Sequence, residues 1–267
     1  MFSHPIVQTP PLTDRAAIPN ALQLRHRAIP TAVRMIILML AGAAPVGSIP
    51  LCILGWLPMT YAAMFVVIPL TLATALLIWQ GSPEAQWAKR GIVAGLAAVF
   101  AYDAVRMPLV WSNIWPDFIP RMGGWVTGVQ NHNALVGYTW RYLGDGAGIG
   151  MSFFLFCGTL MTLRPQLVTQ RPILFSVGYG IFIWGGLMAT VALPARGQEM
   201  LFRLTPTTLL LSLLGHLIYG SMLGLYLRAA AGADAQEFVA PVVNLRSPHV
   251  ATIDSEILVV NPAAAAG

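Results

Sequence analysis

Charged residues within apolar stretches are the first candidates for chemistry in this sequence. Asp103 and Arg106 stand three positions apart, which places them on one face of a helix. Arg141 and Asp145 stand four positions apart and also share a helix face. A charge near the centre of a membrane-spanning helix costs at least about 2.5–3.5 kcal/mol, so such residues must pair or face water. The expected pairs are Asp103 with Arg141 and Arg106 with Asp145.

Two tyrosines and a histidine accompany these charges. Tyr102 precedes Asp103, and His216 and Tyr219 lie together in the segment GHLIYG. A histidine titrates near neutral pH. We therefore expect His216 and the tyrosine hydroxyls to form a proton-sensitive or hydrogen-bonding side of the polar site. The pattern supports two compatible interpretations, a structural ion-pair network and a ligand-binding site. The candidate site residues are Tyr102, Asp103, Arg106, Arg141, Asp145, His216 and Tyr219.

Metal, haem and enzyme chemistry have weaker support. His132 and His216 are metal-ligand candidates, but two histidines without a fixed spacing form no metal or haem motif. The sequence has neither an HExxH motif nor a nucleophile elbow. We therefore predict no cofactor and no catalytic residues, which favours a protein that is not an enzyme, and keep a haem or metal site as the less favoured alternative.

The composition places most of the chain in lipid. Hydrophobic residues make up 57% of the 267 positions and charged residues only 9%, whereas a soluble domain carries about 25% charged residues. Such a chain cannot cover a water-facing surface. The net charge of +5 comes from basic residues placed between apolar runs. This placement is typical of topology signals and excludes a nucleic-acid-binding stripe.

Six apolar stretches are long enough to cross a bilayer, which needs about 20 residues. We therefore predict an all-α, polytopic bundle with three parts: a polar N-terminal arm at 1–34, a transmembrane domain at 35–228, and a largely disordered tail at 229–267. The expected spans are 35–56, 59–80, 91–112, 142–163, 172–194 and 207–227.

The basic residues also predict orientation. They crowd the side that holds both termini, so both ends are expected in the cytoplasm of a multi-pass protein of the cell membrane, in particular a bacterial inner membrane. In this orientation, the four charged residues and His216 all fall in the outer half of the bundle.

Prolines and glycines predict irregular and close-packed helices. Pro45 and Pro50 in the first span predict a kink or a broken helix. A broken helix favours a transporter-type site, and a kink is the alternative. Glycines at i,i+4 spacing predict close backbone approach between helices. They are Gly91 with Gly95, Gly144 with Gly148, Gly146 with Gly150, and Gly220 with Gly224.

The favoured function is a small permease or ligand-binding membrane protein with a polar site in the outer half of the bundle. The alternative is a non-catalytic accessory or structural subunit of a larger membrane complex, which the glycine faces and the two terminal arms favour. The expected partner is the lipid bilayer, with a homo-oligomer or other membrane subunits left open. We assign no family from the sequence.

Overall fold

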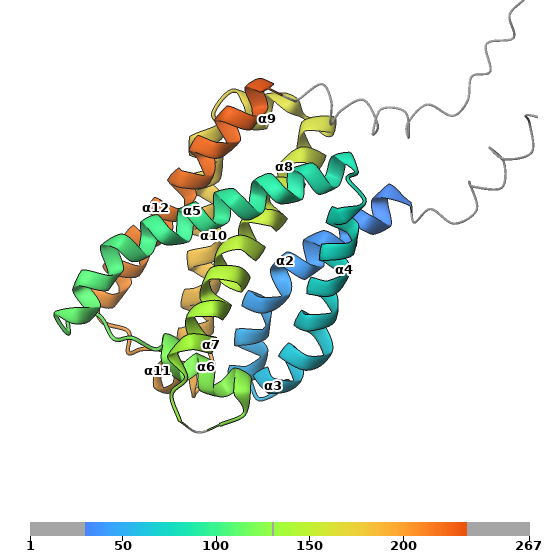
Figure 1. Ribbon diagram of the computed structural model, residues 1–267. Helices are drawn as coiled ribbons and strands as arrows, with labels where there is room; N and C mark the ends of the chain where they lie inside the picture. The colour runs from blue at the N-terminus through green and yellow to red at the C-terminus, as the bar shows by residue number, and fades with distance from the viewer. Residues whose placement is uncertain (1–29, 130, 234–267) are drawn as a thin grey trace, which may run out of the picture.

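The computed structural model describes residues 30–129 and 131–233, and every regular element in them is a helix. Six helices are long and apolar enough to cross a membrane, which confirms the predicted all-α bundle (Figure 1). Most of the terminal arm and tail lies outside the described residues. The spans are α2 (Thr31–Ile53); α3 (Met59–Ala62) with η2 (Ala63–Val67) and α4 (Ile68–Trp79); α5 (Pro83–Trp111); α7 (Ala134–Thr139) with η3 (Trp140–Gly148) and α8 (Ile149–Leu163); α10 (Pro172–Ala192); and α12 (Pro206–Ala233).

Three short helices lie at the ends of the spans. They are α6 (Ile119–Thr127), α9 (Pro165–Thr169) and α11 (Gly197–Met200). Helix α6 occupies the long loop after α5, and Arg121 on it donates a hydrogen bond to the carbonyl oxygen of Glu199 at 2.8 Å. The loops at this end of the bundle are therefore joined to one another.

The fourth span is the centre of the bundle. In its most apolar stretch 72% of the residues are buried, against 17% for α10. It begins at Ala134, earlier than the predicted 142, because Asn133 caps it by accepting a hydrogen bond from the Val136 amide at 3.1 Å. Its middle part, η3, is π-helical over nine residues. A π-helix bonds i to i+5, so each of its turns is wider than an α turn, and such segments frequently occur at functional sites.

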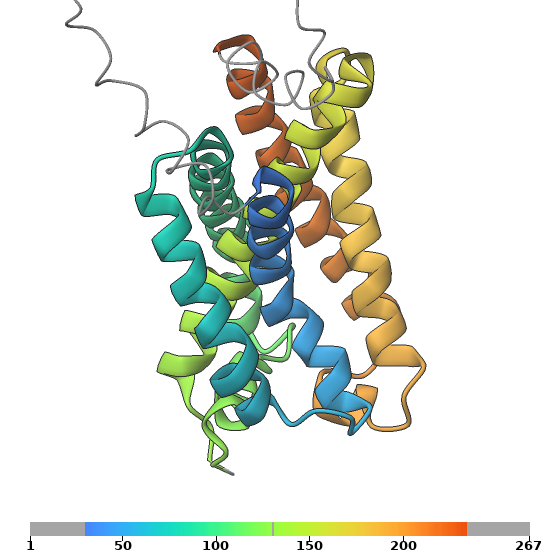
Figure 2. The ribbon, with the colours of Figure 1, turned by 90° about the vertical axis from the view of Figure 1, so that its right-hand side faces the viewer.

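The first span is bent and unbroken. Helix α2 continues from Thr31 to Ile53 through Pro45 and Pro50, and both views show it bending along its length (Figures 1 and 2). The hydroxyl of Ser48 donates to the carbonyl oxygen of Pro45 at 2.6 Å, which supplies a polar contact within the bend. Of the two outcomes predicted for this proline pair, the structure shows the kink.

Glycines let the central span touch its neighbours backbone to backbone. An added Cβ at Gly95 on α5 would clash with the carbonyl oxygen of Gly146, and one at Gly148 would clash with the carbonyl oxygen of Gly42 on α2. Helices α10 and α12 meet in the same way at Gly180 and Gly220. The predicted glycine faces are thus used within the bundle, as small residues are in membrane proteins generally.

Both described chain ends lie at the same end of the bundle, because the spans are even in number (Figures 1 and 2). Near this end the buried carboxylate of Glu84, in the first turn of α5, accepts a hydrogen bond from Arg34 on α2. The two helices are therefore tied together by an ion pair at this end of the membrane domain.

We predict that reporter fusions at Gly267 and within the 113–132 loop lie in opposite compartments, with Gly267 in the cytoplasm. The physical reason is the crowding of arginine and lysine at the end that holds Arg34, Arg90 and Arg228. Alkaline phosphatase and fluorescent-protein fusions measure this. A control fusion at Gly81, in the turn between α4 and α5, must report the same compartment as Gly267; disagreement would contradict the topology.

We also predict that Gly95→Ala lowers the melting temperature of the purified protein in detergent. The added methyl group overpacks the contact with Gly146, and overpacking costs about 1–3 kcal/mol. Gly178→Ala is the matched control, because a Cβ at Gly178 on α10 meets no atom within 4 Å. A Gly95→Ala variant that melts like Gly178→Ala would show that the two helices separate easily.

Candidate functional site

A buried ion pair joins α5 to the central span. The Arg141 Nε lies 3.0 and 2.9 Å from the two carboxylate oxygens of Asp103, and Arg141 Nη2 lies 2.6 Å from Oδ1. Asp103 is 2% exposed, so this pairing offsets the cost of keeping its charge in a low-dielectric setting. The predicted pairing of these two residues is confirmed.

The second expected pair is wrong. Arg106 does not pair with Asp145; its Nη2 lies 2.5 Å from Oδ1 of Asp117, and its Nη1 lies 3.8 Å from Asp103. Asp117 follows α5 in the loop, and the same carboxylate accepts hydrogen bonds from the Ile119 amide at 3.2 Å and from the Tyr138 hydroxyl at 2.8 Å. These contacts fix the Asp117 carboxylate beside Arg106. Asp145 takes no part in this pairing.

Sequence reasoning missed Asp117 because it considered only charges inside the spans. The available signal was charge balance: Arg106 lies near the end of α5, and Asp117 is the only acidic residue in the loop at 113–132. Because Arg106 lies near the end of α5, the adjoining loop is as close to its side chain as another helix is.

Tyr102 is the contact point of three elements. The guanidinium carbon of Arg141 lies 4.6 Å from the centroid of the Tyr102 ring, a cation–π arrangement. The His216 ring on α12 meets the same ring edge-on at 5.7 Å, and Trp115 from the loop does so at 6.5 Å. The buried tyrosine thus brings the ion pair and the histidine side by side.

Helix α12 contributes His216 and Tyr219. The Nδ1 of His216 lies 2.7 Å from the carbonyl oxygen of Ser212, and because a carbonyl only accepts, Nδ1 carries the proton. In the neutral ring Nε2 is then an acceptor. The Tyr219 hydroxyl donates to the carbonyl oxygen of Gly146 at 2.8 Å, which joins α12 to the π-helical segment.

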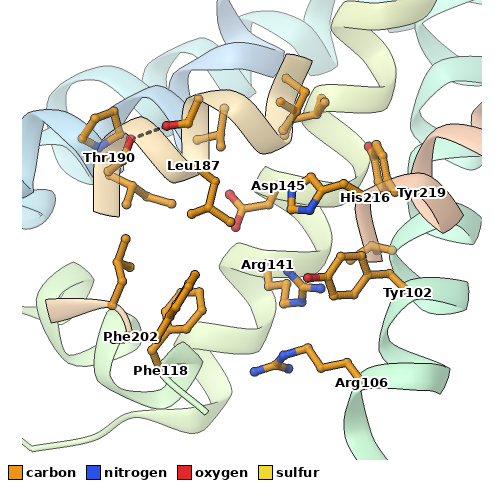
Figure 3. Close-up of a pocket in the computed structure, with 18 of the residues that line it drawn as sticks. Tyr102, Arg106, Phe118, Arg141, Asp145, Leu187, Thr190, Phe202, His216 and Tyr219 are labelled. Carbon is orange, nitrogen blue, oxygen red and sulfur yellow. Dashed lines mark hydrogen bonds between the residues drawn. The ribbon is translucent and has the colours of Figure 1, made fainter. Parts of the chain in front are cut away.

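Asp145 differs from the other buried charges. Its Oδ1 is buried and has no hydrogen-bond partner among the residues that the structure describes. The side chain points into the space between the helices, beside His216 (Figure 3). A carboxylate oxygen in this position needs either a proton or a donor from a bound molecule, because burying it unpaired is costly.

These side chains line a cavity of about 310 Å³, which we call the α2–α10 cavity because these two helices form its outer walls. Val46, Gly47 and Pro50 of α2 face Phe182 and Gly186 of α10 across it. Six of the seven candidate site residues line its polar side. They are Tyr102, Arg106, Arg141, Asp145, His216 and Tyr219, and Thr190 of α10 also lines the cavity (Figure 3). Asp103 does not line the cavity and contacts Arg141 instead.

The cavity is covered by apolar side chains at the end of the bundle that holds α6 and α11. Trp115, Leu201 and Phe202 line it there and are each buried. The rings of Phe118 and Phe202 pack at 5.9 Å between centroids and close the space between the two loops (Figure 3). The side between α2 and α10 is different, because Gly47, Phe182 and Gly186 are exposed there and lie within the membrane-spanning helices. The cavity therefore opens sideways, toward lipid.

The two histidine candidates are not brought to one site. His132 is exposed in the loop before α7 and does not line the cavity, whereas His216 does. Among residues 30–129 and 131–233, no group of three or more His, Cys, Asp or Glu side chains is arranged to hold a metal ion. The site geometry therefore gives the metal hypothesis no ligand set within the described residues.

Comparison of the chain with protein-family models, with curated proteins and with solved structures finds no match. Ideas about the function of this cavity therefore depend on its own geometry and chemistry.

We predict that Asp103→Asn and Arg141→Gln are coupled in a double-mutant cycle read as thermal stability in detergent. Each single change strands a buried charge, which costs about 3–5 kcal/mol. The double variant removes both charges and should therefore lose less stability than the sum of the two single changes, by about 0.5–3 kcal/mol.

The control for this cycle is Arg121→Gln, because Arg121 is exposed and donates to backbone carbonyls of Glu199 and Met200 instead of to Asp103. Its effect should add to that of Asp103→Asn. Additivity in both cycles would mean that Asp103 and Arg141 do not stabilise each other.

Proposed function

We propose that this chain is a small ligand-binding membrane protein, and that the α2–α10 cavity is its binding site. The observation that carries the proposal is a cavity with apolar walls, polar groups on one side and an opening at membrane depth. A permease would use the same cavity as its substrate site, so both forms of the proposal predict the same binding behaviour.

The size and lining of the cavity support binding of a small molecule. Ligand pockets in proteins measure about 300–1,000 Å³ and combine mostly apolar walls with a few convergent polar groups. The cavity has a volume of about 310 Å³, and the apolar side chains of Phe182, Leu187 and Phe202 line it together with Asp145 and His216. An apolar body would contact the former set, and a polar group the latter.

The polar residues divide into two roles. Asp103 with Arg141, and Arg106 with Asp117, satisfy each other and hold α5, the central span and the loop together. Asp145 and His216 present acceptors to the cavity that the described protein groups leave unused. We therefore assign the ion pairs to positioning and these two acceptors to ligand contact.

The accessory-subunit alternative loses one of its supports. The glycine faces favoured it as surfaces for helix packing, but Gly91, Gly95, Gly148 and Gly220 pack against backbone inside the bundle. An internal cavity with unused hydrogen-bond acceptors has no evident purpose in a purely structural subunit. The ligand-binding proposal explains both features.

The proposal predicts that Gly186→Phe reduces binding at least about tenfold. Gly186 is exposed at the mouth of the cavity, and a Cβ there meets no atom within 4 Å, so the ring enters the opening without disturbing the fold. The probe is a photoreactive diazirine analogue of octanol in phosphatidylcholine nanodiscs. The measurement is the labelling of cavity peptides that excess octanol suppresses.

Gly185→Phe is the matched control. It places the same ring on the neighbouring position of α10, where a Cβ also meets nothing within 4 Å, but Gly185 does not line the cavity. This variant should be labelled like the wild type. Wild-type labelling that does not saturate, or equal labelling of all three proteins, would show that the cavity is not a binding site.

A further inference from the structure

The entrance to the α2–α10 cavity restricts which molecules reach it. The loop side is closed by Trp115, Phe118 and Phe202. On the open side the lining residues Gly47 and Gly186 are exposed, and both belong to the membrane-spanning parts of their helices. Neither glycine would contact another group through an added Cβ within 4 Å. A molecule that enters here comes from the hydrocarbon of the bilayer, so it must be lipid-soluble.

The charge balance inside the cavity restricts the polar group of that molecule. Arg141 is engaged by Asp103 through three contacts of 3.0 Å or less, and Arg106 is engaged by Asp117 at 2.5 Å. Asp145 has no ion-pair partner in the described chain, so the cluster holds one more carboxylate than arginine. When all five groups are ionised, the cluster carries a net negative charge, and the unpaired charge is that of Asp145.

The hydrogen-bonding groups beside Asp145 have the same preference. With its Nδ1 proton bonded to Ser212, the neutral His216 ring offers an acceptor at Nε2. The Tyr219 hydroxyl uses its proton on the Gly146 carbonyl. The Trp115 indole Nε1–H, an unpartnered donor, also lines the cavity, but it belongs to the loop side. The free groups at Asp145 and His216 are acceptors, and acceptors bind donors.

Resting on the proposed function, we infer that the ligand is a lipid-soluble amine, which enters between α2 and α10 and places its ammonium group against Asp145. The ammonium supplies three donors and the positive charge that the cluster lacks. Its apolar body lies along Phe182, Leu187 and Phe202. A carboxylate or phosphate in the same place would meet Asp145 as a like charge, and the arginines are already neutralised.

The test uses octylamine, octanol and octanoate, which share one chain and differ in head group. Each competes with the diazirine octanol probe for labelling of the cavity peptides, at equal mole fraction in phosphatidylcholine nanodiscs. Octylamine should compete about ten- to a hundredfold better than octanol, the range that a charge-assisted hydrogen bond provides. Octanoate should compete least.

Asp145→Asn isolates the charge, because the amide keeps the shape and part of the hydrogen bonding. The variant should reduce octylamine competition to about the level of octanol, while Asp145→Glu should retain the preference for octylamine. Since Asp145 has no described ionic partner, Asp145→Asn strands no charge and should melt no lower than the wild type. This melting measurement separates loss of the ammonium contact from loss of folding.

The outcomes separate the two proposals. Saturable labelling with equal competition by all three compounds, or with octanoate strongest, overturns the amine inference and leaves the binding site standing. Labelling that never saturates overturns both. Repeating the measurement in phosphatidylethanolamine nanodiscs identifies the source of the amine: suppressed probe labelling there indicates a lipid head group, and unchanged labelling indicates a free amine.

Discussion

The contact between Asp103 and Arg141 is the constraint on which the site depends. Two opposite charges at membrane depth cannot be left apart, so α5 and the central span are held at one relative depth and rotation. With that geometry fixed, the Tyr102 ring lies under the guanidinium and brings His216 of α12 alongside it. Three spans are thus positioned through one buried pair, and the cavity forms where α2 and α10 complete the enclosure.

The glycine contacts and the ion pairs support each other. Close approach of Gly95 to Gly146 brings α5 near enough to the central span for the short side chain of Asp103 to reach across. The ion pair in turn prevents the helices from sliding along the smooth glycine surface, on which dispersion contacts alone would discriminate weakly between registers. The glycine packing brings α5 and the central span close together, and the ion pair fixes their register.

Several parts of this arrangement follow from the sequence alone. The six spans follow from apolar length, and the pairing of Asp103 with Arg141 follows from equal depth and opposite charge. The partner of Arg106 does not, because the path of the loop that carries Asp117 is not encoded in helical periodicity. Helical periodicity also does not identify the environment of Asp145. Its spacing from Arg141 indicates a shared face, and both residues line the cavity, but the spacing gives no sign that Asp145 lacks a protein partner. The orientation in the membrane and the nature of any ligand remain predictions.

The π-helical segment determines how the site would respond to the loss of one residue during evolution. Each turn of η3 (Trp140–Gly148) accommodates one residue more than an α turn does. Deleting a single residue there would let the segment relax toward an α-helix, because the wide turn would no longer have an extra residue to hold. The flanking helices α7 and α8 would keep nearly the same faces toward their neighbours, and the residues within η3, including Arg141 and Asp145, would change the directions in which they point. A change of one codon would therefore rearrange the polar wall of the cavity and leave the bundle around it in place.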